Sequence, residues 1–86
     1  MWFIYIIQHN TTKQIYIGIT KNLRQRLTQH NLGETTATHR KNGKWSMIYA
    51  EIYRNNEDAK DREKKLKHHD STKHNLIKRN SRSFLY

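Results

Sequence analysis

Two segments near the start of the chain most constrain its fold. Residues 2–7 (WFIYII) are apolar throughout, as expected for a strand that is covered on both faces. Residues 14–20 (QIYIGIT) alternate instead, with isoleucine at every second position. The link between them contains the polar turn formers HNTTK at positions 9–13 and is too short for a crossover connection. The two segments therefore predict an antiparallel hairpin.

The hydrophobic pattern also predicts the pairing register of this hairpin. We expect Tyr5 to lie opposite Tyr16, because this register places the isoleucines of both strands and Trp2 on one face. The other face then carries the two tyrosines, Phe3 and Gly18. A glycine weakens the interior of a strand, so Gly18 indicates a place where something must approach the backbone closely.

A helix is predicted directly after the hairpin. Asn22 can cap it, Gln25 completes a loose capping box, and leucines four residues apart form its apolar stripe. At 100° per residue, Arg26 lies about 60° and His30 about 20° from Leu23 around the helix. Both polar side chains therefore lie close to the buried stripe.

The middle of the chain predicts a loop and a third strand. Residues 31–43 are polar and rich in turn formers. Residues 45–53 (WSMIYAEIY) have the composition of a strand, and we expect Ile48, Ala50 and Ile52 to share one face.

Two further helices are predicted in the last third. The first is highly charged, begins at a cap at Asn55 or Asn56 and runs to about His69, with Ala59 and Leu66 as its only apolar residues after the cap. A last short helix starts within residues 70–72 and carries leucine and isoleucine at 76 and 77. The element order is therefore β-β-α-β-α-α.

Size and charge limit the classes of function. The chain has 86 residues, which is enough for one modest core, and its 17 Lys+Arg against 7 Asp+Glu give a formal net charge of +10. Such a charge attracts polyanions, so nucleic acid is the first partner to consider and an anionic membrane surface the second. The basic helix has almost no apolar face to insert, which disfavours the membrane.

Several other classes lack support. Cysteine is absent, which excludes disulfides and thiolate zinc sites. No segment approaches the ~18 apolar residues of a membrane span, and the apolar opening lacks the basic leader of a signal peptide. We therefore expect a cytoplasmic protein that is associated with nucleic acid and does not span a membrane.

Glu63 is the most informative single residue. It falls about 40° from Ala59 on the apolar stripe of the charged helix, where a carboxylate needs a partner because its desolvation costs several kcal/mol. A hard cation such as magnesium would satisfy it, with water or phosphate oxygens as the other ligands. A Glu63–Lys67 pair one turn apart would satisfy it as well. Both interpretations stay open at this point.

The other polar candidates also have two interpretations. Arg26 either lays its stem on the core with its head in water, or clamps a phosphate with its planar guanidinium. His30 is either a satisfied histidine at the core boundary or a catalytic group. Tyr5 and Tyr16 are good strand residues in any case.

Taken together, these residues resemble the GIY-YIG nuclease domain. The pattern is similar to that of its small stand-alone members, which are similar to the N-terminal nuclease domain of the UvrC excision-repair protein. The resemblance begins with Phe-Ile-Tyr at 3–5 and Tyr-Ile-Gly at 16–18, and it spans nearly the whole chain in order. The remaining matching positions are Thr20, Asn22, Leu23, Arg26, Leu27, His30, Asn31, Ala59, Glu63, Leu66 and Lys67.

The resemblance implies an α+β fold in which helices flank a small three-stranded antiparallel sheet, as a single domain over residues 1–86. It also implies hydrolysis of DNA phosphodiester bonds with Mg²⁺ or Mn²⁺, in DNA repair or recombination, and other repair proteins as candidate partners. No element is suited to reading bases in the major groove, so we expect cleavage to be directed by DNA structure and not by sequence. The alternative is a nucleic-acid-binding module of the same fold without useful turnover.

Site residues carry over by position. The motif tyrosines are Tyr5 and Tyr16, the clamp arginine is Arg26, the helix histidine is His30 and the metal-binding glutamate is Glu63. We expect Tyr5 to help deprotonate the attacking water, which requires that the metal and the arginine favour its phenolate, since a phenol of pKa near ~10 is a poor base.

Two positions depart from the family pattern, and the basic residues complete the expected site. Phe3 stands where the first motif has glycine, and Asn80 is followed by Ser81 where many relatives have proline.

Gly18 would let the DNA backbone or the water shell of a metal approach the sheet. Neighbouring phosphates would be held by Lys21, Arg24, Arg40, Lys41, Lys44, Lys60, Lys64 and Lys73.

Overall fold

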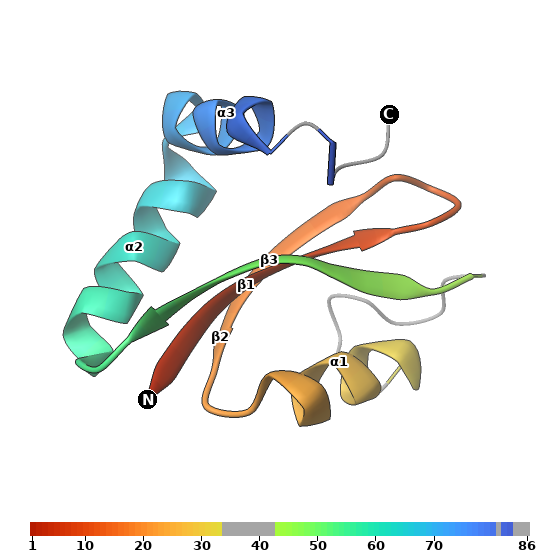
Figure 1. The fold of residues 1–86 in the computed structure, drawn as a ribbon, viewed down its shortest axis with the longest axis horizontal. Coiled ribbons are helices and arrows are strands. Elements are labelled where there is room, and N and C mark those ends of the chain that lie inside the picture. Colours follow the sequence, from red (N-terminus) through yellow and green to blue (C-terminus); the bar gives the residue numbers. More distant parts are fainter. Residues whose placement is uncertain (34–42, 81, 84–86) are drawn as a thin grey trace.

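Three strands form one antiparallel sheet, and β1 is its central strand (Figure 1). The computed structural model describes residues 1–33, 43–80 and 82–83. β1 spans Trp2–His9, β2 spans Ile15–Thr20 and β3 spans Trp45–Tyr53, in the sheet order β2-β1-β3. With the three helices, the element order is β-β-α-β-α-α, which confirms the predicted α+β fold.

The hairpin register differs from the prediction by two residues. Tyr5 pairs with Gly18 and not with Tyr16. The strand β1 continues to His9, whose backbone N–H donates to Gln14 O at 2.9 Å, and this longer hairpin sets the pairing. Because side chains alternate with a period of two, a shift of two residues does not change the face of any side chain. The prediction that all isoleucines share one face is wrong for Ile7, which lies on the face of Tyr5.

The buried side chain of His9 holds the turn that fixes this register. Its Nδ1 accepts the backbone N–H groups of Thr11 and Thr12, at 3.2 and 3.1 Å. Lys13 completes the turn with a positive φ of 65°, which is uncommon for a residue other than glycine. These contacts have no counterpart in the hydrophobic pattern, which is why that pattern could not predict the register.

A bulge in β3 overturns part of the face prediction for this strand. Ile6 pairs with Tyr49 and Ile7 pairs with Met47, which leaves Ile48 as an extra residue. The side chains therefore change faces at this point. Ile48 packs against the cluster that contains Ile6, whereas Ile52 lies opposite Phe3 and is 64% exposed, so the two do not share a face.

The helices begin where the capping residues predicted. Helix α1 spans Leu23–Asn31, and Asn22 Oδ1 accepts the backbone N–H of Gln25 at 3.0 Å. The N–H of Asn22 itself donates to Thr20 Oγ1 at 3.1 Å, so only half of the expected capping box forms. Helix α2 spans Asn56–His68 with Asn55 as its cap, and α3 spans Asp70–Arg79.

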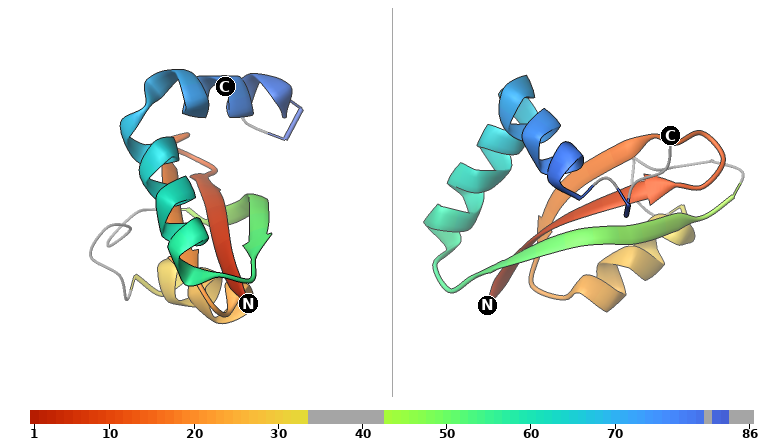
Figure 2. Two further views of the ribbon diagram at one scale, coloured as in Figure 1. Left: turned by 90° about the vertical axis from the view of Figure 1, so that its left-hand side faces the viewer. Right: turned by 45° about the horizontal axis from the view of Figure 1, so that its top comes forward.

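Two apolar clusters cover the two faces of the sheet. The larger cluster contains the isoleucines of β1 and β2 except Ile7, together with Ala59 and Leu66 of α2 and Leu76 of α3. The smaller cluster, on the other face, contains Tyr5 together with the leucines of α1. Helix α1 therefore packs on one face and α2 and α3 on the other, and α3 turns away from the axis of α2 (Figure 2). Within the described ranges, no helix is long and apolar enough to cross a membrane.

Candidate active site

The Tyr5 hydroxyl group lies at the centre of the site. Tyr5 is on the central strand and is fully buried. Its oxygen lies 2.8 Å from His30 Nε2 and 3.3 Å from Arg26 Nε, both on α1. Arg26 and His30 are one helical turn apart, so a single face of α1 brings a cation and an imidazole to the same phenol. The structure thus joins three of the predicted site residues by hydrogen bonds.

The protonation state of His30 fixes the direction of one of these bonds. His30 is 1% exposed, and its burial, followed by the charge of Arg26, lowers its pKa from 6.5 to about 4. The imidazole is therefore neutral near pH 7. Arg26 can only donate to the Tyr5 oxygen, so Nε2 of His30 is the acceptor that the buried Tyr5 O–H needs. We therefore assign His30 the tautomer that carries its proton on Nδ1.

The pKa of Tyr5 moves away from the value that a direct base would need. Burial raises it from 10.0 to about 12, and this outweighs the hydrogen bond from Arg26, which lowers it. The neighbouring Tyr16 and the carboxylate of Glu63 raise the pKa of Tyr5 further. The expected phenolate requires a bound metal as well as Arg26, and Arg26 alone does not outweigh the burial. The effect of a metal on this pKa stays a prediction. Tyr5 is therefore a neutral phenol that is hydrogen-bonded to a neutral His30.

Gly18 makes room for Tyr5 and not for an external group. A Cβ built on Gly18 would lie against the Tyr5 hydroxyl oxygen, 2.5 Å from Cζ and 2.8 Å from Cε1. The two residues are direct partners across β1 and β2, so the ring lies over the glycine backbone. The prediction of an open patch for DNA or for the water shell of a metal is therefore wrong at this position, because the phenol already fills the space.

Tyr16 lies at the half-buried rim of the site. Its ring centroid is 5.0 Å from that of His30 and 6.2 Å from that of Tyr5. The Lys67 ammonium lies 5.7 Å from the Tyr16 centroid and so links β2 to α2. The edge strand thus separates the buried tyrosine from the charged side of α2.

Glu63 forms the ion pair that was one of its two predicted interpretations. Glu63 Oε2 lies 3.4 Å from Lys67 Nζ, and the two side chains are 19% and 39% exposed. Within the described residues, no group of three or more His, Cys, Asp or Glu side chains could hold a metal ion. A single carboxylate supplemented by water and phosphate oxygens is a donor set that suits Mg²⁺ or Mn²⁺, and it does not suit zinc.

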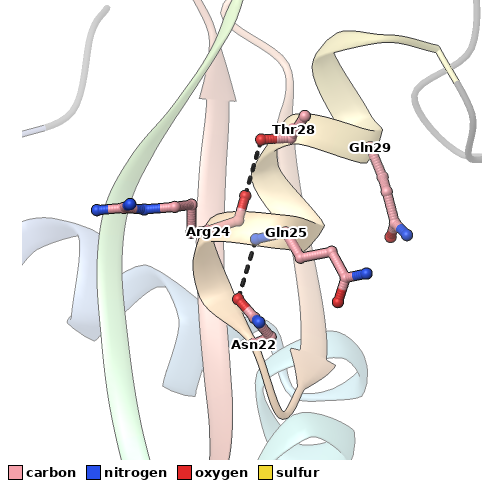
Figure 3. Close-up of a pocket in the computed structure, with 5 residues that line it drawn as sticks. All are labelled: Asn22, Arg24, Gln25, Thr28 and Gln29. Carbon is pink, nitrogen blue, oxygen red and sulfur yellow. Dashed lines mark hydrogen bonds between the residues drawn. The ribbon is translucent and has the colours of Figure 1, made fainter.

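Gln29 is a site residue that sequence reasoning missed. Its Oε1 accepts a hydrogen bond from Arg26 NH1 at 3.1 Å and so fixes the second side of the guanidinium. It also lines a shallow groove of about 430 Å³ along α1 with Asn22, Arg24, Gln25 and Thr28 (Figure 3). The spacing of three residues between Arg26 and Gln29 is the signal that could have identified it.

The remaining predicted residues are distributed around this centre. Lys60 and Lys64 are exposed on α2, and Arg24 is exposed on α1, where it points away from Gln29 in Figure 3. The Lys21 ammonium lies 4.7 Å from the Trp2 ring. Lys44 is exposed before β3, Lys73 is half-buried in α3, and Arg40 and Lys41 lie outside the described residues.

Asn80 is not brought to this centre. Its Nδ2 donates to the Leu76 carbonyl at 3.0 Å, which caps the end of α3. Leu76 packs in the cluster on the opposite face of the sheet from Tyr5. The structure therefore gives Asn80 a role in ending the helix.

Known proteins share this combination of fold and sequence. The chain is 33% identical over 85 residues to the UPF0213 protein DP2720 of Desulfotalea psychrophila. The alignment covers 96% of this chain and 76% of that protein. The solution NMR structure of the UPF0213 protein BH0048 of Bacillus halodurans has the same fold, with a TM-score of 0.57 at 22% identity, over 91% of this chain and 84% of that one. The GIY-YIG catalytic domain family matches residues 1–79. The chain therefore belongs to the GIY-YIG family, a nuclease family.

Proposed function

We propose that this protein is an endonuclease that hydrolyses DNA phosphodiester bonds with Mg²⁺ or Mn²⁺. The observation that carries the proposal is the Tyr5 hydroxyl group, which lies between a guanidinium donor and a neutral imidazole acceptor. A buried phenol needs a hydrogen-bond partner in any protein. Packing alone does not require that a guanidinium and an imidazole both contact it. Membership of a nuclease family makes hydrolysis of nucleic acid the chemistry that these groups would serve.

The arrangement supports a proton relay through Tyr5. In this scheme, water loses a proton to the Tyr5 oxygen as the Tyr5 proton moves to His30 Nε2. The resulting hydroxide attacks phosphorus, the bond from phosphorus to the leaving oxygen breaks, and the leaving oxygen takes up a proton from solvent. No standing phenolate is needed, but the lowered pKa of His30 makes its imidazole a weak proton acceptor in the free protein. The negative charge of a bound phosphodiester would raise this pKa and so let His30 take the proton. Arg26 compensates charge on the phosphoryl oxygens while it holds the phenol in place.

Glu63 is the residue that would hold the metal ion. A bound divalent cation would supply stabilisation of the leaving oxygen. Its binding would replace Lys67 as the partner of the carboxylate, because the ammonium already neutralises Glu63. We therefore expect Lys67 to compete with the metal. We also expect DNA structure to direct cleavage, in repair or recombination, since the exposed basic residues contact phosphates more readily than bases.

Nicking of supercoiled plasmid and of branched or flapped DNA, with and without Mg²⁺ or Mn²⁺, tests the activity. Glu63→Gln and Tyr5→Phe should each lose cleavage by about 10²-fold or more, as for loss of a catalytic group. Glu57→Gln is the control, because Glu57 is an exposed carboxylate in the first turn of the same helix. Nicking that survives both site substitutions would refute the assignment, and DNA binding without metal-dependent cleavage would favour a binding module.

Competition by Lys67 has its own test, which does not depend on turnover. Lys67→Met removes the ammonium from Glu63 and should lower the dissociation constant of Mn²⁺, measured by electron paramagnetic resonance, by about tenfold. Lys64→Met removes an exposed lysine from the same helix and is the matched control. Equal Mn²⁺ affinities of the two variants would contradict a cation site on Glu63.

A further inference from the structure

A second polar cluster lies on the face of the sheet opposite Tyr5. Glu51 of β3 accepts the hydroxyl groups of Tyr49 and Tyr53, at 2.8 and 2.9 Å. It also accepts two hydrogen bonds from Arg62 of α2, from Nε at 2.9 Å and from NH2 at 3.0 Å. Burial opposes ionisation of Glu51, but these hydrogen bonds outweigh it and lower its pKa. Glu51 is therefore an ionised carboxylate with four donors, which fixes Arg62 in position.

Arg62 forms one wall of a small cavity between α2 and α3. The cavity has a volume of about 170 Å³, and α3 supplies the rest of its lining through Thr72, Asn75, Leu76 and Arg79. These positions are three, four and seven residues from the first, so they form one face of the helix. Apart from Leu76, each of the five lining side chains carries a hydrogen-bond donor.

The charges of the cavity suit a single anion. Arg62 is compensated by Glu51, but it uses only two of its five N–H groups in that pair. Arg79 is exposed and makes no hydrogen bond or ion pair within the described part of the chain. The cavity therefore has one uncompensated positive charge together with hydroxyl, amide and guanidinium donors. A phosphodiester group, with one negative charge and several acceptor oxygens, matches this set.

The cavity is separate from the Tyr5 site. Leu76 packs in the cluster of the opposite sheet face, and Glu51 lies on β3 whereas Glu63 faces β2. Arg62 and Glu63 follow each other in α2 and point about 100° apart around its axis. A nucleic-acid strand that passes the Tyr5 site would have to turn around the edge of the sheet to reach Arg79.

We propose that the Arg62–Arg79 cavity binds a backbone phosphodiester of a second nucleic-acid segment, distinct from the one at the Tyr5 site. A branched or sharply bent nucleic acid offers two such segments, whereas a straight duplex offers one. The cavity would thus contribute to the choice of DNA structure. This inference concerns binding and does not require that the protein cleaves DNA.

Fluorescence anisotropy without divalent metal tests the proposal with a four-way DNA junction and a linear duplex of the same length. Arg79→Gln should weaken junction binding about threefold to tenfold and reduce the slope of log K against log salt by about one, with little change for the duplex. Lys78→Gln, which removes an exposed charge from the neighbouring position outside the cavity, is the control. The proposal would be overturned if the two variants weakened junction binding equally. It would also be overturned if Arg79→Gln weakened binding of the junction and of the duplex by the same factor.

A second measurement identifies the ligand chemistry. In ¹H–¹⁵N spectra, a short thymidine oligonucleotide should shift the amide signals of Thr72 and Asn75 and the side-chain signal of Arg79, besides those of the Tyr5 site. Arg79→Gln should abolish the first set only. If inorganic phosphate shifts the same signals at equal or lower concentration, the cavity is a site for a free anion and the nucleic-acid assignment is wrong.

Discussion

At the scale of single residues, the site depends on one hydrogen-bond direction. Arg26 can only donate, so the Tyr5 oxygen accepts from it and passes its own proton toward His30. The family pattern identified all three residues, but not this direction. The direction depends on the burial of His30, which is a property of the assembled core. A pattern of residue types therefore predicts which residues form the site. The direction of the hydrogen bonds between them depends on burial in the folded protein.

The lowered pKa of His30 predicts a pH-dependent stability. In the unfolded chain the imidazole titrates near 6.5, whereas in the folded protein it stays neutral down to about 4. Stability from this residue is therefore complete above about pH 6.5 and is lost as the pH falls toward 4, by on the order of 3 kcal/mol. Urea unfolding at several pH values should show this loss in the parent protein and not in His30→Gln.

An exposed histidine provides the control for this experiment. His68→Gln replaces an exposed histidine at the end of α2 and should show the same loss of stability as the parent protein. If His30→Gln has the same pH dependence as the parent protein, the imidazole is not neutral in the folded state, and the donor assignment for Tyr5 fails with it.

The close packing of Tyr5 on Gly18 predicts that one added methyl group at position 18 destabilises the protein. Gly18→Ala places a Cβ 2.5 Å from Tyr5 Cζ, so the buried ring or the strand must shift. We expect a loss of about 1–3 kcal/mol in the free energy of unfolding, together with reduced cleavage. Ala50→Ser, which adds one atom at the exposed position opposite Tyr5 on β3, is the control. A fully stable Gly18→Ala would contradict the packing of the phenol on this glycine.

At the scale of elements, sequence patterns predicted helices and strands well and their relative positions less well. Caps such as Asn22 and Asn55 located the helix starts, because a capping side chain acts within three residues. The hairpin register was wrong by two residues, since hydrophobic alternation repeats every two residues. The bulge at Ile48 has no local signal, so the faces of β3 beyond it could not be predicted.

The attachment of α1 to the sheet gives a prediction at this scale. Asn31, at the end of α1, accepts the Trp45 N–H at 2.7 Å and donates to the Trp45 carbonyl at 3.1 Å. Asn31→Ala would leave the N–H of a buried residue without its partner and should cost about 1–3 kcal/mol. The measurement is urea unfolding, combined with hydrogen exchange of the Trp45 amide.

Asn31→Asp separates the two bonds of this attachment. The carboxylate keeps the acceptor for the Trp45 N–H and loses only the donor to the carbonyl, so its loss of stability should be clearly smaller. The same variants should affect cleavage in the same order, because α1 carries both Arg26 and His30. Equal losses for alanine and aspartate would show that the acceptor bond contributes little.

At the scale of the whole molecule, helix α2 presents positive charge on two sides of the sheet. Lys60, Lys64 and Lys67 recur along one side of α2, and Lys67 places that side next to β2. Arg62 points to the other side, toward β3. The net charge of +10 is a property of composition, but this division into two basic regions follows from the packing of α2 between the edges of the sheet.

The exposed lysines along the β2 side of α2, Lys60, Lys64 and Lys67, predict how DNA affinity depends on salt concentration. Lys64→Gln should reduce the slope of log K against log salt by about one and weaken binding of linear and branched DNA alike. Lys13→Gln is the control, because the hairpin turn that contains Lys13 lies at the opposite end of the molecule from α2 (Figure 1). Fluorescence anisotropy over a salt series measures both. The same slope for the two variants would exclude α2 from the DNA path.

The complete burial of Tyr5 has a consequence for how this family evolves. Because the phenol is also a packing residue of the smaller cluster, replacing it with a small side chain would cost stability whether or not cleavage is selected. A family member without nuclease activity would therefore keep this tyrosine. Loss of activity in a lineage should first become visible at Glu63, which is partly exposed and can be replaced with little damage to the core.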